Sequence, residues 1–340
     1  MKVCALVVTY NDRFKYLEKV IDQLLQSDIN GIIVIDNNSS LNSCDQLNTL
    51  EKKYSGWLKA IYLNENIGSA GGYFAGLQEF YRMDDYDFVW LLDDDNVPEK
   101  NALDIIKKFW LNLNSKDKED NIALLSYRND RNIYYEAVLK NNPDMVIGQK
   151  NGFLGFDLRT YLIRKRNKLF NIQSSDRLHM DENIEYGKVS ASYYGGLFFH
   201  KKLLEGIGYP NPDFFVYMDD IEFTSRINKT GGVLYVLFKS RINDIDEKWK
   251  DKKENGSVLK LPSINDLNAD RFYYQLRNRL YFEKHYWVTN RFIFRINKNV
   301  YILILKLVML FNKKLKYKSV IKRAIKDALE DNLGRRTNIY

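Results

Sequence analysis

Four short apolar segments rich in β-branched residues recur near the start of the chain at nearly even intervals. They begin at residues 3, 31, 58 and 88, so 27 to 30 residues separate each start from the next. The stretches between them carry apolar residues at helical spacing. This interval suits a strand, a covering helix and a return to a parallel neighbour. The pattern predicts an α/β fold with a mostly parallel central sheet and flanking helices, with strands over Val3–Tyr10, Gly31–Asp36, Leu58–Leu63 and Phe88–Asp93.

Polar side chains follow each of these segments at its carboxyl end. In a parallel sheet these ends share one edge, and ligands bind beyond it. We therefore expect a binding site built from the four strand ends. The residues concerned are Thr9, Tyr10, Asn11 and Arg13 after the first strand, Asp36 and Asn38 after the second, Asn66 after the third, and Asp93, Asp94 and Asp95 after the fourth.

The triplet Asp93-Asp94-Asp95 is the most unusual of these strand ends. Adjacent carboxylates repel each other, and at the end of a buried strand a cation would offset that repulsion. In an extended strand Asp93 and Asp95 point to the same side, so they can share one magnesium or manganese ion with diphosphate oxygens. The alternative is a solvated acidic turn, or a helix N-cap, before Pro98. The position after an apolar strand favours the metal site.

A glycine cluster, Gly68-Ser69-Ala70-Gly71-Gly72, follows the third strand and opens a predicted helix. Small residues there let backbone amides approach an anionic ligand at a helix N-terminus. The alternative is close packing of the helix on the sheet. A dinucleotide-binding fold would place its glycines after the first strand, where this chain has Thr9-Tyr10-Asn11. A dehydrogenase is therefore disfavoured.

A second acidic pair, Asp219-Asp220, follows the aromatic run Phe214–Tyr217. A carboxylate next to aromatic rings and another acid has a raised proton affinity, which suits a group that takes a proton from a sugar hydroxyl. The alternative is an exposed helix start, where acids are favoured in the first turn. The sequence leaves both interpretations open.

Taken together, these motifs resemble glycosyltransferase family 2, the inverting GT-A enzymes, over most of residues 1–235. The resemblance implies a Rossmann-like GT-A domain that binds a nucleotide sugar, in which an acceptor hydroxyl attacks the anomeric carbon in line. The metal, manganese or magnesium, would stabilise the departing diphosphate. The likeness rests on Thr9-Tyr10-Asn11, Asp36–Ser39, Asn66, Gly68, Gly71 and Gly72, Asp93–Asp95, Gly195-Gly196 and Asp219-Asp220.

The resemblance also implies roles for the matched positions. Asp220 would be the general base, with Asp219 beside it, and Asp95 would bind the metal. On the donor side, Asp36 would contact the uracil or thymine ring, and Asp93 would lie toward the ribose and the metal. The full donor set is Thr9, Tyr10, Asn11, Arg13, Asp36, Asn38, Asn66, Gly71, Gly72, Asp93 and Asp94. The sugar and acceptor side comprises Gly195, Gly196 and Tyr217.

Three further segments look most like bacterial galactofuranosyl- and rhamnosyltransferases of surface-polysaccharide assembly: Trp90–Pro98, Met218–Glu222 and Arg277–Arg279. They imply UDP-galactofuranose as donor, with dTDP-rhamnose as the alternative, and a lipid-diphosphate-linked glycan such as an O-antigen or capsule precursor as acceptor. The alternative to an enzyme is a catalytically silent protein that binds nucleotide sugars or associates with the membrane. Such enzymes often carry a metal-binding His after the base, but Leu237–Trp249 has none; Asn243, Asp244 or Asp246 are oxygen-bearing substitutes.

The chain divides by composition into a catalytic domain, an extension and a tail. We expect the GT-A domain over 1–235, with a nucleotide-sugar half over 1–127 and an acceptor half over 128–235. The polar stretch 129–183 predicts irregular strands and a mobile loop. A helical extension follows over 236–290, and a basic tail occupies 291–340.

The positive charge of the chain is concentrated near its end. Residues 284–323 hold 11 Lys or Arg and no acid, so the rest of the chain carries 8 − 11 = −3 of the net +8. The apolar run 300–311 is too short to span a bilayer, so residues 291–325 predict an amphipathic helix on an anionic membrane; a helix packed on the protein is the alternative. No nucleic-acid-binding module accompanies the charge.

Two cysteines and the lack of a signal-peptide pattern indicate a cytoplasmic protein. With a membrane-binding tail, it would be peripheral on the inner face of the plasma membrane. An oligomer is compatible with the sequence.

Overall fold

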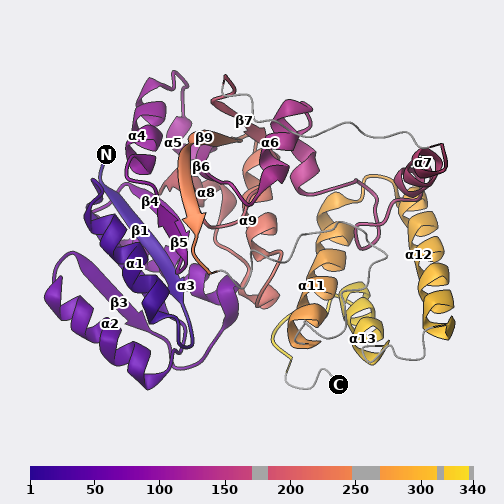
Figure 1. Ribbon diagram of the computed structural model, residues 1–340, viewed down its shortest axis with the longest axis horizontal. Helices are drawn as coiled ribbons and strands as arrows, with labels where there is room; N and C mark the ends of the chain where they lie inside the picture. The colour runs from indigo at the N-terminus through magenta and orange to yellow at the C-terminus, as the bar shows by residue number, and fades with distance from the viewer. Residues whose placement is uncertain (171–182, 247–268, 312–317, 337–340) are drawn as a thin grey trace. The chain divides into compact units, whose positions relative to one another are not determined.

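The computed structural model describes residues 1–170, 183–246, 269–311 and 318–336. The chain forms two compact units. The first comprises residues 1–147, 180–212 and 219–253, and the second comprises 148–179, 213–218 and 254–340. Both units are drawn in Figure 1 and are described separately below.

The first unit is built on a nine-stranded sheet in the order β3-β2-β1-β4-β8-β6-β9-β5, with β7 paired to β9. The four predicted strands form its parallel part, because β1 pairs with both β2 and β4, and β2 pairs with β3, all in parallel. The predicted α/β fold is confirmed. These strands are β1 (Val3–Thr9), β2 (Gly31–Asp36), β3 (Leu58–Tyr62) and β4 (Phe88–Asp93).

The remaining strands extend the sheet beyond β4. Strand β8 runs antiparallel to β4 and to β6, and β6 pairs in parallel with β9 across an irregularity after Ser126. Strands β5 and β7 both pair antiparallel with β9. The bounds are β5 (Asn96–Pro98), β6 (Ile122–Arg128), β7 (Tyr186–Val189), β8 (Leu197–His200) and β9 (Val233–Asp244).

Helices cover both faces of the parallel strands. Residues Val3, Ala5 and Val7 of β1 share one face, where they pack with buried residues of α1 (Phe14–Leu25), α2 (Leu41–Lys53) and α4 (Ala102–Asn112). Leu6 and Val8 point to the other face, toward α3 (Gly68–Arg82). The alternation of side chains along a buried strand therefore sets which helix covers which face.

The glycines of α3 allow it to lie close to the sheet. A Cβ atom at Gly76 would lie 2.5 Å from Leu6 Cδ1, and one at Gly72 would lie 2.6 Å from Val8 Cγ1. A Cβ at Gly71 would meet Ile67 of the preceding turn at 2.7 Å. Helix-to-sheet packing, the alternative noted from the sequence, therefore accounts for Gly72 and Gly76, whereas donor contact at Gly71 and Gly72 stays a prediction.

The polar stretch expected to carry irregular strands is largely helical where it is described; residues 171–182 of it lie outside the described residues. Helix α6 buries Tyr134, Tyr135 and Ala137. Tyrosine is a residue type enriched in strands, but here Tyr134 and Tyr135 pack on one buried helix face. The elements are α6 (Asn132–Leu139), the short η1 (Pro143–Val146) and α7 (Leu158–Leu169), the last in the second unit.

Short helices complete the first unit, and the second unit is helical. The short ones are α5 (Lys118–Asn121) and α8 (Leu203–Ile207); η2 (Pro212–Phe214) lies where the chain passes from the first unit to the second, and α9 (Asp219–Lys229) belongs to the first unit. In the second unit, α11 (Ala269–Phe282) continues into the π-helical η3 (Glu283–Trp287), and α12 (Arg291–Phe311) and α13 (Lys318–Leu329) follow. A helical C-terminal region is confirmed.

The second unit has two small cores. In one, buried Phe272, Tyr273 and Tyr274 of α11 pack with Val320 and Ile321 of α13. In the other, Phe153 and Phe156 pack with Tyr301 of α12. Strand β9 continues past residue 235, where the sequence suggested a domain end, and residues 213–218 join the second unit instead of the first.

Candidate active site

The register of the sheet brings three predicted residues to one edge. Thr9 is paired with Asp36 across β1 and β2, and Val8 is paired with Asp93 across β1 and β4. Thr9, Asp36 and Asp93 therefore end neighbouring strands at nearly the same level. This edge is the carboxyl edge at which open α/β sheets bind ligands.

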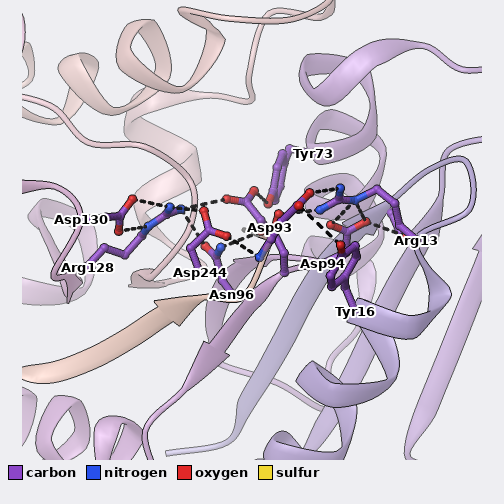
Figure 2. Close-up of polar contacts among 12 residues, drawn as sticks. Arg13, Tyr16, Tyr73, Asp93, Asp94, Asn96, Arg128, Asp130 and Asp244 are labelled. Carbon is purple, nitrogen blue, oxygen red and sulfur yellow. Dashed lines mark hydrogen bonds and ion pairs between the residues drawn. The ribbon is translucent and has the colours of Figure 1, made fainter. Parts of the chain in front are cut away.

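Arg13 binds one side of the acidic cluster at this edge (Figure 2). Its Nε donates to Asp94 at 2.8 Å, its Nη2 to Asp95 at 2.5 Å, and its Nη1 to Asp246 at 2.8 Å. Asp94 also accepts from Thr9 Oγ1 at 2.8 Å. With Asp94 only 3% and Asp95 only 8% exposed, one guanidinium holds three carboxylates that have little access to water.

A second arginine, Arg128, pairs with carboxylates on the other side of the cluster. Its Nη2 donates to Asp244 at 2.6 Å, and its Nε donates to Asp130 at 3.0 Å. Its Nη1 lies 3.8 Å from Asp93 Oδ2. Figure 2 shows Arg128 and Arg13 on opposite sides of Asp93 and Asp94.

The cluster holds more negative than positive charge. Among the described residues, its ion pairs join three arginines to six carboxylates, 3 − 6 = −3: Arg13, Arg128 and Arg131 with Asp93, Asp94, Asp95, Asp130, Asp244 and Asp246. Burial, and then the charges of Asp93, Asp94 and Asp244, raise the pKa of Asp95 to about 8. Burial likewise raises the pKa of Asp94 to about 6.

Carboxylate oxygens and surplus negative charge fit a hard divalent cation. Asp93 is the most accessible of the triplet: its side chain is 40% exposed, and one oxygen accepts from Tyr73 Oη at 2.9 Å. Asp95 accepts from Arg13 on one oxygen and from Asn96 Nδ2 on the other, at 2.8 Å. Within the described ranges, no group of three or more His, Cys, Asp or Glu side chains has the arrangement of a metal site. Strand β4 ends at Asp93, and Asp94 and Asp95 lie in a turn, so the extended geometry expected for Asp93 and Asp95 is not found; a metal held by this pair, with other oxygens from the ligand, stays a prediction.

The proposed substitutes for a missing histidine are already engaged. Asp244 pairs with Arg128, and Asp246 pairs with Arg13. Asn243 lies on β9 opposite Val97 of β5. Residues 247–249, the end of that stretch, lie outside the described residues.

The loop after β2 is tightly organised around Asp36. This carboxylate is buried, and it accepts from the Ser39 backbone N–H at 2.7 Å and from Cys44 Sγ at 3.3 Å. The neighbouring Asn37 donates to Gly68 O at 2.8 Å and accepts from Ile67 N at 2.9 Å. Asn37, which was not assigned a role from the sequence, thus ties the end of β2 to the turn before α3.

The other predicted donor-side residues lie in the turns around this edge. Asn11 and Asn38 both have left-handed backbones, with φ of 53° and 59°. Asn66 accepts from Gly68 N at 2.9 Å, which closes the turn before α3. The Arg13 guanidinium lies 5.5 Å from the centre of the Tyr10 ring. These contacts explain the local fold; nucleotide contact at these positions stays a prediction.

Asp219 and Asp220 are the first residues of α9, in the first unit. Asp219 is buried and accepts from Ser69 Oγ of α3 at 3.1 Å. Burial raises the pKa of Asp219 to about 6. Loss of hydration among the surrounding protein atoms raises the pKa of Asp220 well above the usual carboxyl range, and the negative charge of Asp219 is the second cause. The negative charge of Asp93 contributes to both shifts, so the pair lies within electrostatic reach of β4.

Gly195 and Gly196 lie where the chain enters β8 beside β4. A Cβ atom at Gly195 would lie 2.1 Å from Asn96 Oδ1 and 2.9 Å from Asp93 Oδ2, so no larger residue fits there. Gly196 has a φ of 95° and donates to Leu91 O at 2.8 Å. Both glycines are therefore required by the backbone beside Asp93. Tyr217 belongs to the second unit, and its assignment to the acceptor side stays a prediction.

Arg128 and Asn96 were missed from the sequence. Arg128 ends β6, so it is a strand-end residue like the others, but its place beside Asp93 depends on how β6 pairs with β8 and β9 in the sheet. Asn96 is fully buried between Asp95 and Arg128, and no local pattern distinguishes it.

Comparisons with known proteins agree with this geometry. Residues 4–117, 114 of the 340, match the family model described as glycosyl transferase family 2. The structure resembles that of S. aureus TarS 1-349 in complex with UDP-GlcNAc, with a TM-score of 0.51 and 16% identity, over 97% of this chain and 81% of that one. Among curated proteins, none matches the chain in sequence.

Two other solved structures are longer than this chain. S. aureus TarS matches with a TM-score of 0.51 and 14% identity, over 98% of this chain and 48% of TarS. GalNAc-T7 with UDP, GalNAc and Mn²⁺ matches with a TM-score of 0.48 and 12% identity, over 72% of this chain and 44% of that one. The chain thus spans about half the length of these two proteins, and identities this low show the fold alone.

A mostly parallel sheet whose carboxyl edge carries Asp36 and the acidic triplet is the arrangement of the GT-A fold. Within that class, residues 4–117 match the family model of glycosyl transferase family 2.

Proposed function

We propose that this protein is an inverting glycosyltransferase that moves a sugar from a pyrimidine nucleotide sugar to an acceptor hydroxyl. The observation that carries the proposal is the pair Asp219-Asp220 in the same compact unit as the acidic edge of β4. A partly buried carboxyl with a raised pKa next to a second acid, as at Asp220, suits a general base. Sugar transfer needs a site that binds the nucleotide and a base that activates the acceptor. In this proposal the carboxyl edge of the sheet is the first and Asp220 is the second.

In the proposed mechanism, each part of the edge has one task. Asp36 holds the pyrimidine ring, and Thr9 and Asn11 border the nucleotide. Asp95 and Asp93 would hold a manganese or magnesium ion. Such an ion stabilises the negative charge that develops on a departing diphosphate.

Asp220 accepts the proton of the attacking hydroxyl, while Ser69 and Asp219 keep the start of α9 in place. The hydroxyl oxygen forms the new bond to the anomeric carbon as the bond to the diphosphate oxygen breaks, with inversion.

The donor is proposed to be UDP-galactofuranose, with dTDP-rhamnose as the alternative. The fold shared with TarS, whose complex contains UDP-GlcNAc, supports a uridine nucleotide. Thermal-shift titration with UDP-, dTDP- and GDP-sugars in manganese tests this choice. We expect the UDP-sugars to raise the melting temperature most. A larger shift with dTDP-rhamnose would select the alternative donor, and donor binding without turnover would support the silent rival.

The acceptor is proposed to be a lipid-diphosphate-linked glycan, such as an O-antigen or capsule precursor, at the inner face of the plasma membrane. Helix α12 supports this location. Its exposed apolar residues recur at helical spacing on one face, and its opposite face packs in the cores of the second unit. The exposed residues are Phe292, Ile293, Ile296, Leu303, Leu307 and Leu310.

The charge of α12 complements an anionic surface. The helix holds four Lys or Arg and no Asp or Glu. In α13, Val320, Ile321 and Ala324 are buried, so the cations of residues 318–325 are on its outer side. Of the described helices, none has the length and apolar character needed to cross a bilayer. An apolar face rimmed by cations suits a helix lying in the plane of an anionic membrane.

Aspartate at Leu303 and Leu307 tests this surface. These side chains are 58% and 46% exposed, so the double variant keeps the fold but loses apolar area that would enter the lipid. In flotation with phosphatidylglycerol vesicles, we expect membrane binding to fall by at least about 10²-fold. Leu111→Asp, at a leucine of α4 in the first unit that is 67% exposed, is the control and should float like the unchanged protein. If the unchanged protein and both variants float equally, or if none of the three floats, the membrane proposal is contradicted.

A further inference from the structure

The six residues before α9 have an unusual backbone. Phe215, Tyr217 and Met218 have φ values of 65°, 67° and 66°, in the left-handed region that residues with a Cβ avoid. Three such residues within four positions do not persist unless surrounding contacts hold them. This segment, Asp213–Met218, will be called the entry loop, because the chain passes from it directly into α9.

One buried side chain, Asn278 of α11, makes the contacts that hold the entry loop. Its Nδ2 lies 2.8 Å from Phe214 O, 2.7 Å from Val216 O and 2.9 Å from Tyr217 O. Its Oδ1 accepts from Arg277 Nε at 2.8 Å, which leaves the amide nitrogen turned to the loop. Asn278 and the entry loop belong to the same compact unit.

Arg277 adds a second set of bonds to the same backbone. Its Nη2 donates to Phe214 O at 3.1 Å and to Asp213 O at 3.3 Å, and its Nη1 donates to Gly334 O at 2.6 Å. Gly334 N in turn donates to Asp213 O at 2.7 Å. This fully buried guanidinium thus binds backbone carbonyls. Its charge strengthens bonds that fix the start of the entry loop.

Packing fixes the side chains of the loop as well. The Phe215 and Tyr274 rings lie 4.9 Å apart, and Phe215, Val216 and Tyr217 pack against the core that α11 forms with α13. The loop is therefore held at its carbonyls and at its side chains. Its strained backbone has few ways to relax.

We propose that Asn278 is a positioning residue for the transfer reaction. Through two amide hydrogens shared among three carbonyls of the entry loop, it fixes the left-handed backbone through which the chain enters α9, where Asp219 and Asp220 are the first two residues. This inference rests on the proposed role of Asp220 as general base. Without the amide, the left-handed residues relax toward right-handed or extended conformations, and the first turn of α9 loses its fixed direction.

The chemistry of an amide explains why asparagine is needed here. The side chain must donate toward the loop carbonyls and accept from Arg277 at the same time. Aspartate has the same shape, but it lacks the donors and would place negative charge against three carbonyl oxygens. Alanine would remove the amide donor from Val216 O and Tyr217 O, whereas Phe214 O would keep its bond from Arg277 Nη2.

The test compares Asn278→Ala with Asn297→Ala. Asn297 is a buried asparagine of α12 in the same unit; it donates to Asn151 O at 2.8 Å and accepts from Leu158 N at 3.0 Å, away from the entry loop. We expect both variants to lose stability, but only Asn278→Ala to lower kcat for UDP-sugar turnover, by about 10²-fold, since small misplacement of a catalytic group has effects of that size. UDP affinity should change by less than about two-fold, because the substitution leaves the residues assigned to nucleotide binding, at the ends of β1, β2 and β4, unchanged.

Hydrogen exchange provides a readout that does not depend on turnover. In Asn278→Ala, amides of residues 214–221 should exchange faster than in Asn297→Ala, and Asn278→Asp should behave like Asn278→Ala. Equal kcat in the two alanine variants, or unchanged exchange over 214–221, overturns the positioning role. Absence of turnover in the unsubstituted protein with every donor would instead refute the proposed function, so the two failures are distinguishable.

Discussion

Replacing Arg13 by methionine is expected to lower the free energy of unfolding by about 3 kcal/mol, because it leaves buried carboxylates without their partner. The guanidinium pairs with Asp94, Asp95 and Asp246, and the side chains of Asp94 and Asp246 are each only 4% exposed. Methionine fills similar volume, so the loss reflects charge more than packing. Urea denaturation followed by tryptophan fluorescence measures the change.

Lys15→Met is the matched control for Arg13→Met. Lys15 is an exposed cation two residues away, whose ammonium lies over the Tyr16 ring at 4.7 Å. Its replacement should change the free energy of unfolding by less than about 0.5 kcal/mol. If the two variants unfold at the same urea concentration, Arg13 does not balance the acidic cluster.

The second large effect is expected from Asp220→Asn, which keeps the shape of the side chain but cannot accept a proton. Loss of a general base lowers kcat by about 10³-fold. UDP affinity should stay unchanged, because the nucleotide contacts are assigned to the ends of β1, β2 and β4. The wild-type kcat should fall as the pH drops through the raised pKa of Asp220, since the base acts only when it is ionised.

Asp104→Asn provides the control for Asp220→Asn. Asp104 also lies in the first turn of a helix, α4, where it is exposed. The Asp104→Asn variant should retain the full kcat of the unsubstituted protein. Turnover by Asp220→Asn at the wild-type rate would remove Asp220 from the mechanism.

Local sequence patterns predicted the parallel half of the sheet and its polar edge. Each of the four strands could be read from one apolar run, because buried parallel strands need apolar residues on both faces. The carboxyl ends then followed from the parallel direction alone, which is why Thr9, Asp36 and Asp93 were found together. Pairing with Arg13 was not predicted, because Asp246 is 233 residues away in the chain.

The parts that the sequence did not predict depend on contacts between distant segments. Arg128 joins the cluster through β6, whose place between β8 and β9 no local pattern specifies. The entry loop belongs to the second unit because Asn278 and Arg277 hold its carbonyls from 61 to 64 residues away. The Arg277–Arg279 segment was noticed only for its resemblance to other transferases, and its contacts supply a physical reason for two of those residues.

Titration of UDP into the protein in the presence of manganese, followed by calorimetry, tests most directly whether this edge binds a nucleotide sugar. We expect binding by the unsubstituted protein, and an affinity lower by about 10-fold to 10²-fold in Asp36→Ala, where a charged hydrogen-bond partner of the base is lost. Asp45→Ala, at an exposed acid of the neighbouring helix α2, should bind UDP normally. Failure of UDP, dTDP and GDP alike to bind, or equal UDP affinity in Asp36→Ala, would contradict the assignment of the site.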